Sequence, residues 1–118
     1  MQLSSETLAR FKGGQLEIQN KNERYIFRGQ IENVVVEDNI VKVKFAWLAK
    51  GKDGFPPCRW IKDDNLDYAA STKIYFASEI GDGRIAINSP IVGEMAVFFP
   101  PDGSKLDPAK VEGLQLAA

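Results

Sequence analysis

The chain has 118 residues, a formal net charge of −1, 44% hydrophobic and 26% charged residues, a single cysteine and no histidine. These values predict one globular domain, spanning 1–118, and exclude a general electrostatic attraction to nucleic acids or to anionic membranes. Without histidine the chain also lacks the base of the usual serine and cysteine hydrolases and the ligands of ordinary zinc sites. We therefore expect neither an enzyme nor a bound metal or cofactor.

The beginning of the sequence and its single cysteine favour an intracellular protein. Residues 1–14, MQLSSETLARFKGG, lack the apolar stretch of a signal peptide. One cysteine cannot form an internal disulfide, and no apolar run approaches the ~20 residues that cross a bilayer. We expect a cytoplasmic location and no membrane contact.

A short helix is predicted within 3–12. Ser4 is suited to cap its first turn, and Gly13 and Gly14 are suited to end it. Leu8 and Phe11, three residues apart, form an apolar stripe that would lie on a larger core.

From Gln15 onward, apolar residues alternate with polar ones, which indicates β-strands. Asp38-Asn39 and the Gly81–Gly83 segment are suited to the tight turns between them. A bulge is expected near Asn33-Val34, because the alternation shifts there. The strands are predicted at 15–19, 25–37, 40–50, 84–88 and 94–99, with one or two more within 65–80.

This series of short strands and turns predicts a mainly β fold. We expect a small antiparallel β-barrel, SH3-like or OB-like, with about six strands within 15–99. Within 100–118, Asp107 and Pro108 favour a one-turn helix, followed by a frayed tail. Closure of the barrel would leave no strand edge exposed.

The segment 40–50, IVKVKFAWLAK, shows the clearest alternation of the chain. Strict alternation places one set of side chains on the buried face and the other set on the solvent face. The buried set is Val41, Val43, Phe45 and Trp47, and the solvent set is Lys42, Lys44, Ala46 and Leu48.

Basic residues are concentrated between Ile40 and Lys62, a stretch that contains six basic residues and only one acidic residue, Asp53. The loop 49–65 within this stretch also holds two adjacent prolines that would stiffen it. The candidate binding residues are Lys42, Lys44, Lys50, Lys52, Phe55, Arg59, Trp60 and Lys62.

Two functions fit this region. The first is contact with a protein or peptide, in which the stiffened loop presents aromatic anchors at a low entropic cost. The second is weak binding of nucleic acid, with lysines along the phosphates and Phe55 or Trp60 stacking on bases. We favour the protein or peptide, bound by a monomer or a weak homo-oligomer.

Structural explanations also exist for the same residues. Lys42 and Lys44 could be the solvated side of a strand, and Phe55 and Trp60 could close one end of the fold. The thiol of Cys58, although near basic residues, is predicted to be inert.

Overall fold

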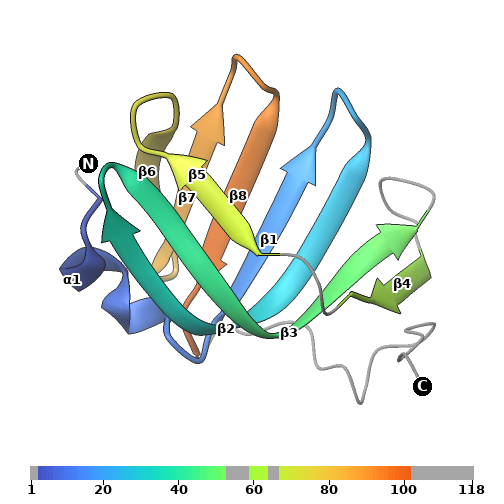
Figure 1. The fold of residues 1–118 in the computed structure, drawn as a ribbon, viewed down its shortest axis with the longest axis horizontal. Helices are drawn as coiled ribbons and strands as arrows, with labels where there is room; N and C mark the ends of the chain where they lie inside the picture. The colour runs from blue at the N-terminus through green and yellow to red at the C-terminus, as the bar shows by residue number, and fades with distance from the viewer. Residues whose placement is uncertain (1–2, 53–58, 64–66, 102–118) are drawn as a thin grey trace.

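The computed structural model describes residues 3–52, 59–63 and 67–101. They form one short helix and a sheet of eight antiparallel strands (Figure 1). The predicted mainly β fold with an N-terminal helix is therefore confirmed. The elements are α1 (Ser5–Leu8), followed by a 3-10 turn (Ala9–Phe11), β1 (Gln15–Asn20), β2 (Tyr25–Glu37), β3 (Ile40–Lys52), β4 (Arg59–Lys62), β5 (Tyr68–Ser71), β6 (Phe76–Gly81), β7 (Arg84–Ser89) and β8 (Glu94–Phe99).

The strands lie in the order β4-β3-β2-β1-β8-β7-β6, and β5 pairs with the first half of β3. The sheet rolls up but does not close, because β5 and β6 do not pair with one another in the described part of the chain. The expected closed barrel of about six strands is thus corrected to an open, rolled sheet of eight strands. The predicted C-terminal helix lies outside the described residues.

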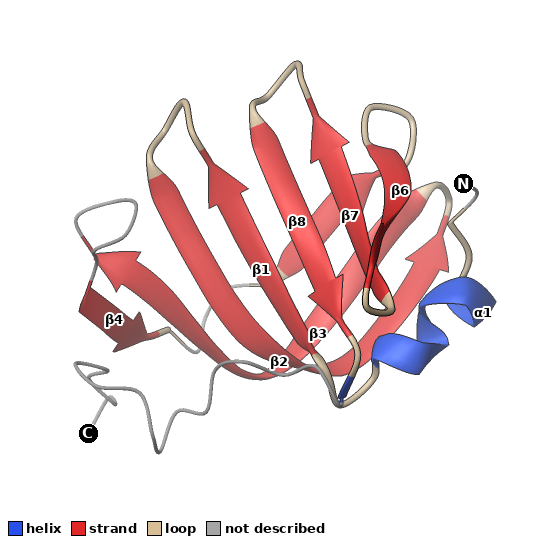
Figure 2. Cartoon of the chain, turned by 180° about the vertical axis from the view of Figure 1, so that it is seen from behind, coloured by secondary structure: helices blue, strands red, loops and turns tan. Residues whose placement is uncertain are grey.

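Helix α1 begins where the sequence predicts. The Thr7 amide donates to Ser4 Oγ at 3.1 Å, and Thr7 Oγ1 accepts from the Ser4 amide at 2.9 Å. Two buried side chains, Leu8 and Phe11, attach this end of the chain to the core, and the rings of Phe11 and Phe98 lie 5.5 Å apart. The helix lies at one end of the rolled sheet (Figure 2).

The main core fills the inside of the roll. It contains side chains from one face of nearly every strand, together with the two helical residues. We call the side of the sheet that faces this core the inner face and the opposite side the outer face. The strand residues buried in the core are Leu16, Ile18, Ile31, Val34, Val41, Val43, Tyr68, Ala70, Ile85, Ile87, Ala96 and Phe98.

The long β2–β3 hairpin contains two register irregularities. Gln30 pairs with Trp47 and Ile31 pairs with Phe45, so Ala46 is an extra residue in β3. A second shift lies between Ile31 and Asn33 in β2, just before the expected bulge position. Each bulge bends its strand and increases the local twist, which helps the sheet to roll.

The bulge at Ala46 reverses the alternation of β3. Beyond it, Leu48 lies opposite Gly29 and is buried, whereas Trp47 packs on the outer face against a separate cluster. The predicted faces are correct up to Phe45 and wrong for Trp47 and Leu48, because one extra residue exchanges the two faces of a strand.

Gly29 has a steric role beside this bulge. A Cβ atom at Gly29 would lie 2.5 Å from Phe45 Cδ1 and 2.9 Å from Leu48 Cδ1. The two strands can therefore approach one another here only because Gly29 has no side chain.

Candidate functional site

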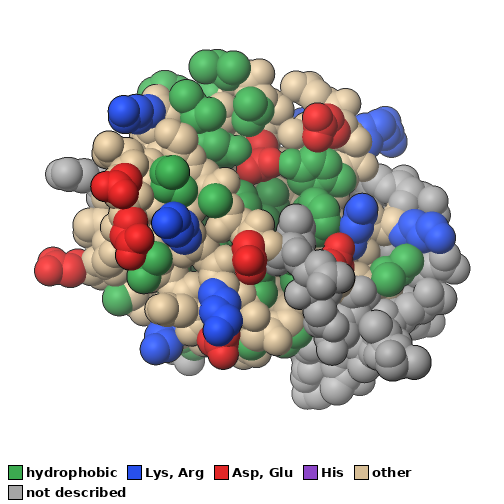
Figure 3. All heavy atoms as spheres, in the orientation of Figure 1, with side chains coloured by type: hydrophobic (Ala, Val, Ile, Leu, Met, Phe, Trp, Pro, Cys, Tyr) green, Lys and Arg blue, Asp and Glu red, His purple; other side chains and the backbone are tan. Residues whose placement is uncertain are grey.

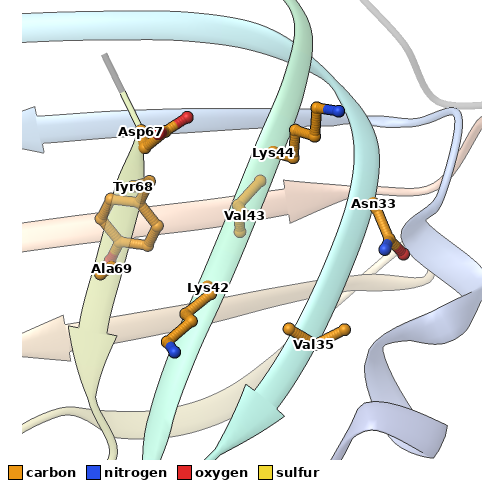
Figure 4. A pocket seen from close by; sticks show the side chains of 8 residues that line it. All are labelled: Asn33, Val35, Lys42, Val43, Lys44, Asp67, Tyr68 and Ala69. Atoms are coloured by element: carbon orange, nitrogen blue, oxygen red, sulfur yellow. The ribbon is translucent and has the colours of Figure 1, made fainter.

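The lysines in the first half of β3 lie on the outer face. Lys42 Nζ is 3.5 Å from a Glu37 carboxylate oxygen, and Lys44 Nζ is 3.3 Å from one of Glu32. Both lysines border a groove of about 390 Å³ over β2, β3 and β5. Figure 4 shows the two side chains pointing away from one another along β3. The residues lining this groove are Asn33, Val35, Lys42, Val43, Lys44, Asp67, Tyr68 and Ala69.

Acidic side chains outnumber basic ones around this outer groove. Its two lysines are accompanied by three carboxylates, those of Glu32, Glu37 and Asp67. The ion pairs are exposed and therefore contribute only about 0–1 kcal/mol each. An incoming phosphate or carboxylate would still have to displace a glutamate from each lysine, so this groove is a poor anion site.

The lysines in the second half of β3 have different surroundings. Lys50 lies opposite Phe27 on the inner face, with Nζ 5.7 Å from the ring centroid. Both Lys50 and Lys52 are exposed, and neither forms an ion pair within the described residues. They line a hollow of about 240 Å³ together with Ile61 and Asp63.

This hollow belongs to an extension of the sheet. Residues 49–52 of β3 pair with β4, from Ala49 opposite Lys62 to Lys52 opposite Arg59. We call this two-stranded extension, residues 49–52 and 59–62, the arm. The prediction of a loop over 49–65 is therefore wrong for these residues, which are strand, and Asp63 is the one other described residue of that segment.

Trp60 supports the arm from the outer face. Its side chain is only 8% exposed and packs in a cluster with Ile26 and Ala49. The Arg28 guanidinium lies 5.2 Å from the Trp60 ring, and Arg28 Nε is 2.8 Å from a Glu17 carboxylate oxygen. Trp60 therefore packs into the fold in this structure instead of presenting an open stacking surface.

The remaining predicted site residues are only partly described. Arg59 and Lys62 lie in β4, but their side chains are outside the described residues, as are Phe55 and Cys58. Of the eight candidates, the structure brings together Lys50 and Lys52 on the inner side of the arm. It places Lys42 and Lys44 on the other face, away from this pair.

A second cluster lies near the ends of β1, β2 and β8. All three tyrosines of the chain converge there on Glu94. The Tyr75 hydroxyl donates to Glu94 Oε1 at 2.7 Å, and the Tyr25 hydroxyl donates to Oε2. The Tyr68 hydroxyl is buried beside them, close enough to Glu94 for its charge and a hydrogen-bond interaction to help raise the Tyr68 pKa, but no described partner has normal hydrogen-bond geometry. We call Tyr25, Tyr68, Tyr75 and Glu94 the tyrosine cluster.

Burial governs the titration of these tyrosines. Desolvation, followed by the hydrogen bond to Glu94, raises the pKa of Tyr25 to about 12. The pKa values of Tyr68 and Tyr75 are also raised, in each case first by burial. All three hydroxyls therefore stay neutral at physiological pH, and those of Tyr25 and Tyr75 donate to the carboxylate.

The tyrosine cluster was not predicted from the sequence. Its members come from four different strand or turn segments, and only the antiparallel pairing brings them together. Figure 3 shows hydrophobic side chains gathered on the upper part of one side of the molecule, with a few acidic side chains between them. The alternation of Tyr25 with Ile26 indicates a face, but not the partner across the roll.

Comparison of the chain with models of known protein families, with curated proteins and with solved structures finds no match. Within the described residues, no three side chains of the metal-ligating acidic and cysteine types lie together. The described part of the chain also contains no helix with the length and apolar character needed to cross a bilayer. Any functional assignment must therefore come from the surfaces described above.

Proposed function

We propose that this protein is a non-enzymatic binding module that holds an acidic segment of a partner protein on the inner side of the arm. The observation that carries the proposal is the pair of lysines, Lys50 and Lys52, which are exposed and form no ion pair in the described part of the chain. The described lining of their hollow contains one carboxylate, that of Asp63, so the two lysines leave it with an excess of positive charge. Exposed cations of this kind attract an acidic partner and raise its association rate.

The shape of the hollow favours a peptide over a small molecule. Its volume of about 240 Å³ lies below the ~300–1,000 Å³ of typical small-molecule pockets. The half-buried Ile61 and the ring of Phe27 provide apolar contact beside the two charges. An acidic segment with one apolar side chain would match this combination.

Nucleic acid is the second candidate partner, and the arrangement of lysines supports it less well. A phosphate backbone needs a continuous row of cations along one surface. Here Lys42 and Lys44 lie on the outer face in ion pairs, and Lys50 and Lys52 lie on the inner face. No single strand of nucleic acid could follow both pairs along β3.

We also propose that the rolled sheet is an open relative of the small SH3-like or OB-like barrels and acts in the cytoplasm. Small barrels of this type bind linear ligands on one side of a curved sheet. The open edges of β5 and β6 in the described residues are compatible with a partly open barrel.

A peptide selection tests the proposed function. A displayed library of random decapeptides is selected on the wild-type protein, on K50Q/K52Q and on K42Q/K44Q, which removes the same charge from the other face. We expect acid-rich sequences with an apolar residue to be enriched by the wild type and by K42Q/K44Q, but not by K50Q/K52Q. Equal enrichment by all three proteins, or no acidic preference, would contradict the proposal.

The nucleic-acid alternative needs a parallel measurement. Fluorescence anisotropy with a mixed oligonucleotide pool at low salt should show no binding by any of the three proteins. Binding that falls in both double variants would favour nucleic acid, because phosphate contacts contribute with little regard to position.

A further inference from the structure

Glu94 is a half-buried carboxylate that lines a hollow of about 210 Å³ together with Ser89 and Lys21. Within the described residues it forms no ion pair, and its hydrogen-bond donors are the neutral hydroxyls of Tyr25 and Tyr75. The ring of Phe27 lies 5.0 Å from that of Tyr25 and extends the aromatic surroundings. The negative charge is thus held among aromatic rings whose faces attract cations.

Two buried hydroxyls in the same region lack partners. Tyr68 is 6% exposed and Ser89 is 2% exposed, and neither hydroxyl oxygen has a partner with normal hydrogen-bond geometry among the described residues. Ser89 lies directly opposite Glu94 in the β7–β8 ladder, and the charge of Glu94 acts on the Tyr68 hydroxyl. Buried polar groups without partners are rare, and either a water molecule or a bound ligand would satisfy them.

These groups together define the chemistry of the missing partner. A carboxylate and hydroxyl oxygens accept hydrogen bonds, and aromatic faces attract positive charge. One carboxylate alone is too few strong ligands for a calcium site, which takes six to eight oxygens. A quaternary ammonium would have no N–H to give to the hydroxyls, whereas a primary ammonium has three.

We propose that the tyrosine cluster, with Ser89, binds a primary ammonium group, supplied either by a lysine side chain of a partner or by a free alkylamine. Glu94 neutralises the charge, and the Tyr68 hydroxyl accepts an N–H. The hydrogen bonds from Tyr25 and Tyr75 hold the carboxylate in place. These two hydrogen bonds are enough to stabilise Glu94 without a ligand. They leave the hydroxyls of Tyr68 and Ser89 without a well-formed hydrogen bond, which the ammonium group would supply.

This site is distinct from the arm, although the two share the inner face. Lys50 rests on Phe27, and Phe27 contacts Tyr25, so the aromatic surface continues from one to the other. The sites have opposite charge and would take opposite groups. Ammonium binding therefore does not rest on the acidic-segment proposal and can fail or succeed separately.

The test is an NMR titration of the isotope-labelled protein. The probes are n-butylammonium, a lysine blocked at both backbone ends, and tetramethylammonium, each as the chloride at ionic strength matched with sodium chloride. We expect the first two to shift the resonances of Glu94, Tyr68 and Tyr75, and tetramethylammonium to bind about tenfold more weakly or not at all. Tighter binding of the blocked lysine than of butylammonium assigns the site to a partner's side chain, and equal or weaker binding assigns it to a free amine.

Variants complete the test. Tyr68→Phe removes a hydroxyl that has no partner, so it should fold normally and bind butylammonium several-fold more weakly. Glu94→Gln should bind about tenfold more weakly or not at all, because hydrogen bonds to charged groups are the stronger ones. Glu79→Gln, which changes an exposed carboxylate on β6, is the control and should bind like the wild type.

Two results would overturn the inference. One is the absence of specific shifts with butylammonium at about 50 mM, a concentration that would reveal even millimolar affinity. The other is unchanged affinity in a folded Tyr68→Phe protein. K50Q/K52Q should bind butylammonium like the wild type, which keeps this result separate from the fate of the arm.

Discussion

Strand β3 carries two pairs of lysines, and its two halves present them in different ways. In the first half of β3, Lys42 and Lys44 lie on the outer face and form ion pairs with glutamates of β2. Where β3 pairs with β4, Lys50 and Lys52 lie on the inner face without such partners in the described residues. A single extra residue, Ala46, separates the two arrangements. Similar residues on one strand therefore lie in ion pairs in one half and without ion pairs, among the described residues, in the other.

The largest expected loss of stability comes from placing a lysine just after the bulge, at Leu48, compared with placing one at the bulge residue, Ala46. Leu48→Lys places a charge at a buried position and should cost about 4 kcal/mol or more, or prevent folding. Ala46→Lys places the same charge at an exposed position and should change the stability by less than about 0.5 kcal/mol. Urea unfolding measures both. Similar stability of the two variants would mean that the alternation of β3 continues without a break.

A smaller loss is expected on the outer side of the arm. Trp60→Ala removes a side chain that packs with Ile26 and Ala49, and should cost about 3 kcal/mol. Phe76→Ala, at a residue that is 65% exposed, is the control and should stay within about 0.5 kcal/mol. If thermal unfolding showed equal, small losses, Trp60 would be a free surface and the arm would lack this support.

The tyrosine cluster predicts a loss of stability in alkali. The pKa of Tyr25 is raised from 10.0 to about 12, and those of Tyr68 and Tyr75 are raised as well. The folded state thus holds these protons more tightly than the unfolded state, so the stability is complete below pH 10 and falls as the pH rises through about 12. Tyrosinate absorbance and circular dichroism, followed together, should change in this window. Three tyrosines that titrate near pH 10 without unfolding would contradict the burial of the cluster.

The smallest effect is expected for the paired lysines. K42Q/K44Q breaks two exposed ion pairs, each contributing about 0–1 kcal/mol, and should change the free energy of unfolding by at most about 2 kcal/mol. Raising the salt concentration should remove this difference in stability, since salt screens exposed ion pairs. A loss of several kcal/mol would instead show that the outer face of β3 is structurally essential.

Much of the fold is encoded locally and could be predicted. The Ser4 cap, the burial of Leu8 and Phe11 and the position of most strands follow from capping preferences and alternation. The hairpin turn at Asp38-Asn39 also follows, since both residues adopt positive φ. These features depend on residues close together in the sequence.

Features that depend on distant pairing could not be predicted. The extra residue at Ala46 has no signal of its own, because alanine fits either face of a strand. The open edges of β5 and β6 reflect how far the sheet rolls, which is set by bulges and twist along β2 and β3. The convergence of Tyr25, Tyr68 and Tyr75 on Glu94 requires the complete topology.

The face on which the side chains beyond Ala46 lie decides whether the two lysine pairs of β3 are on opposite faces of the sheet. A nuclear Overhauser experiment measures it. We predict contacts between the Trp47 indole and the side chains of Ile26 or Trp60, and between the Lys50 methylenes and the Phe27 ring. Contacts of Trp47 with the main core, for example with Ile18, would contradict this prediction. They would show that the two lysine pairs share one face of β3.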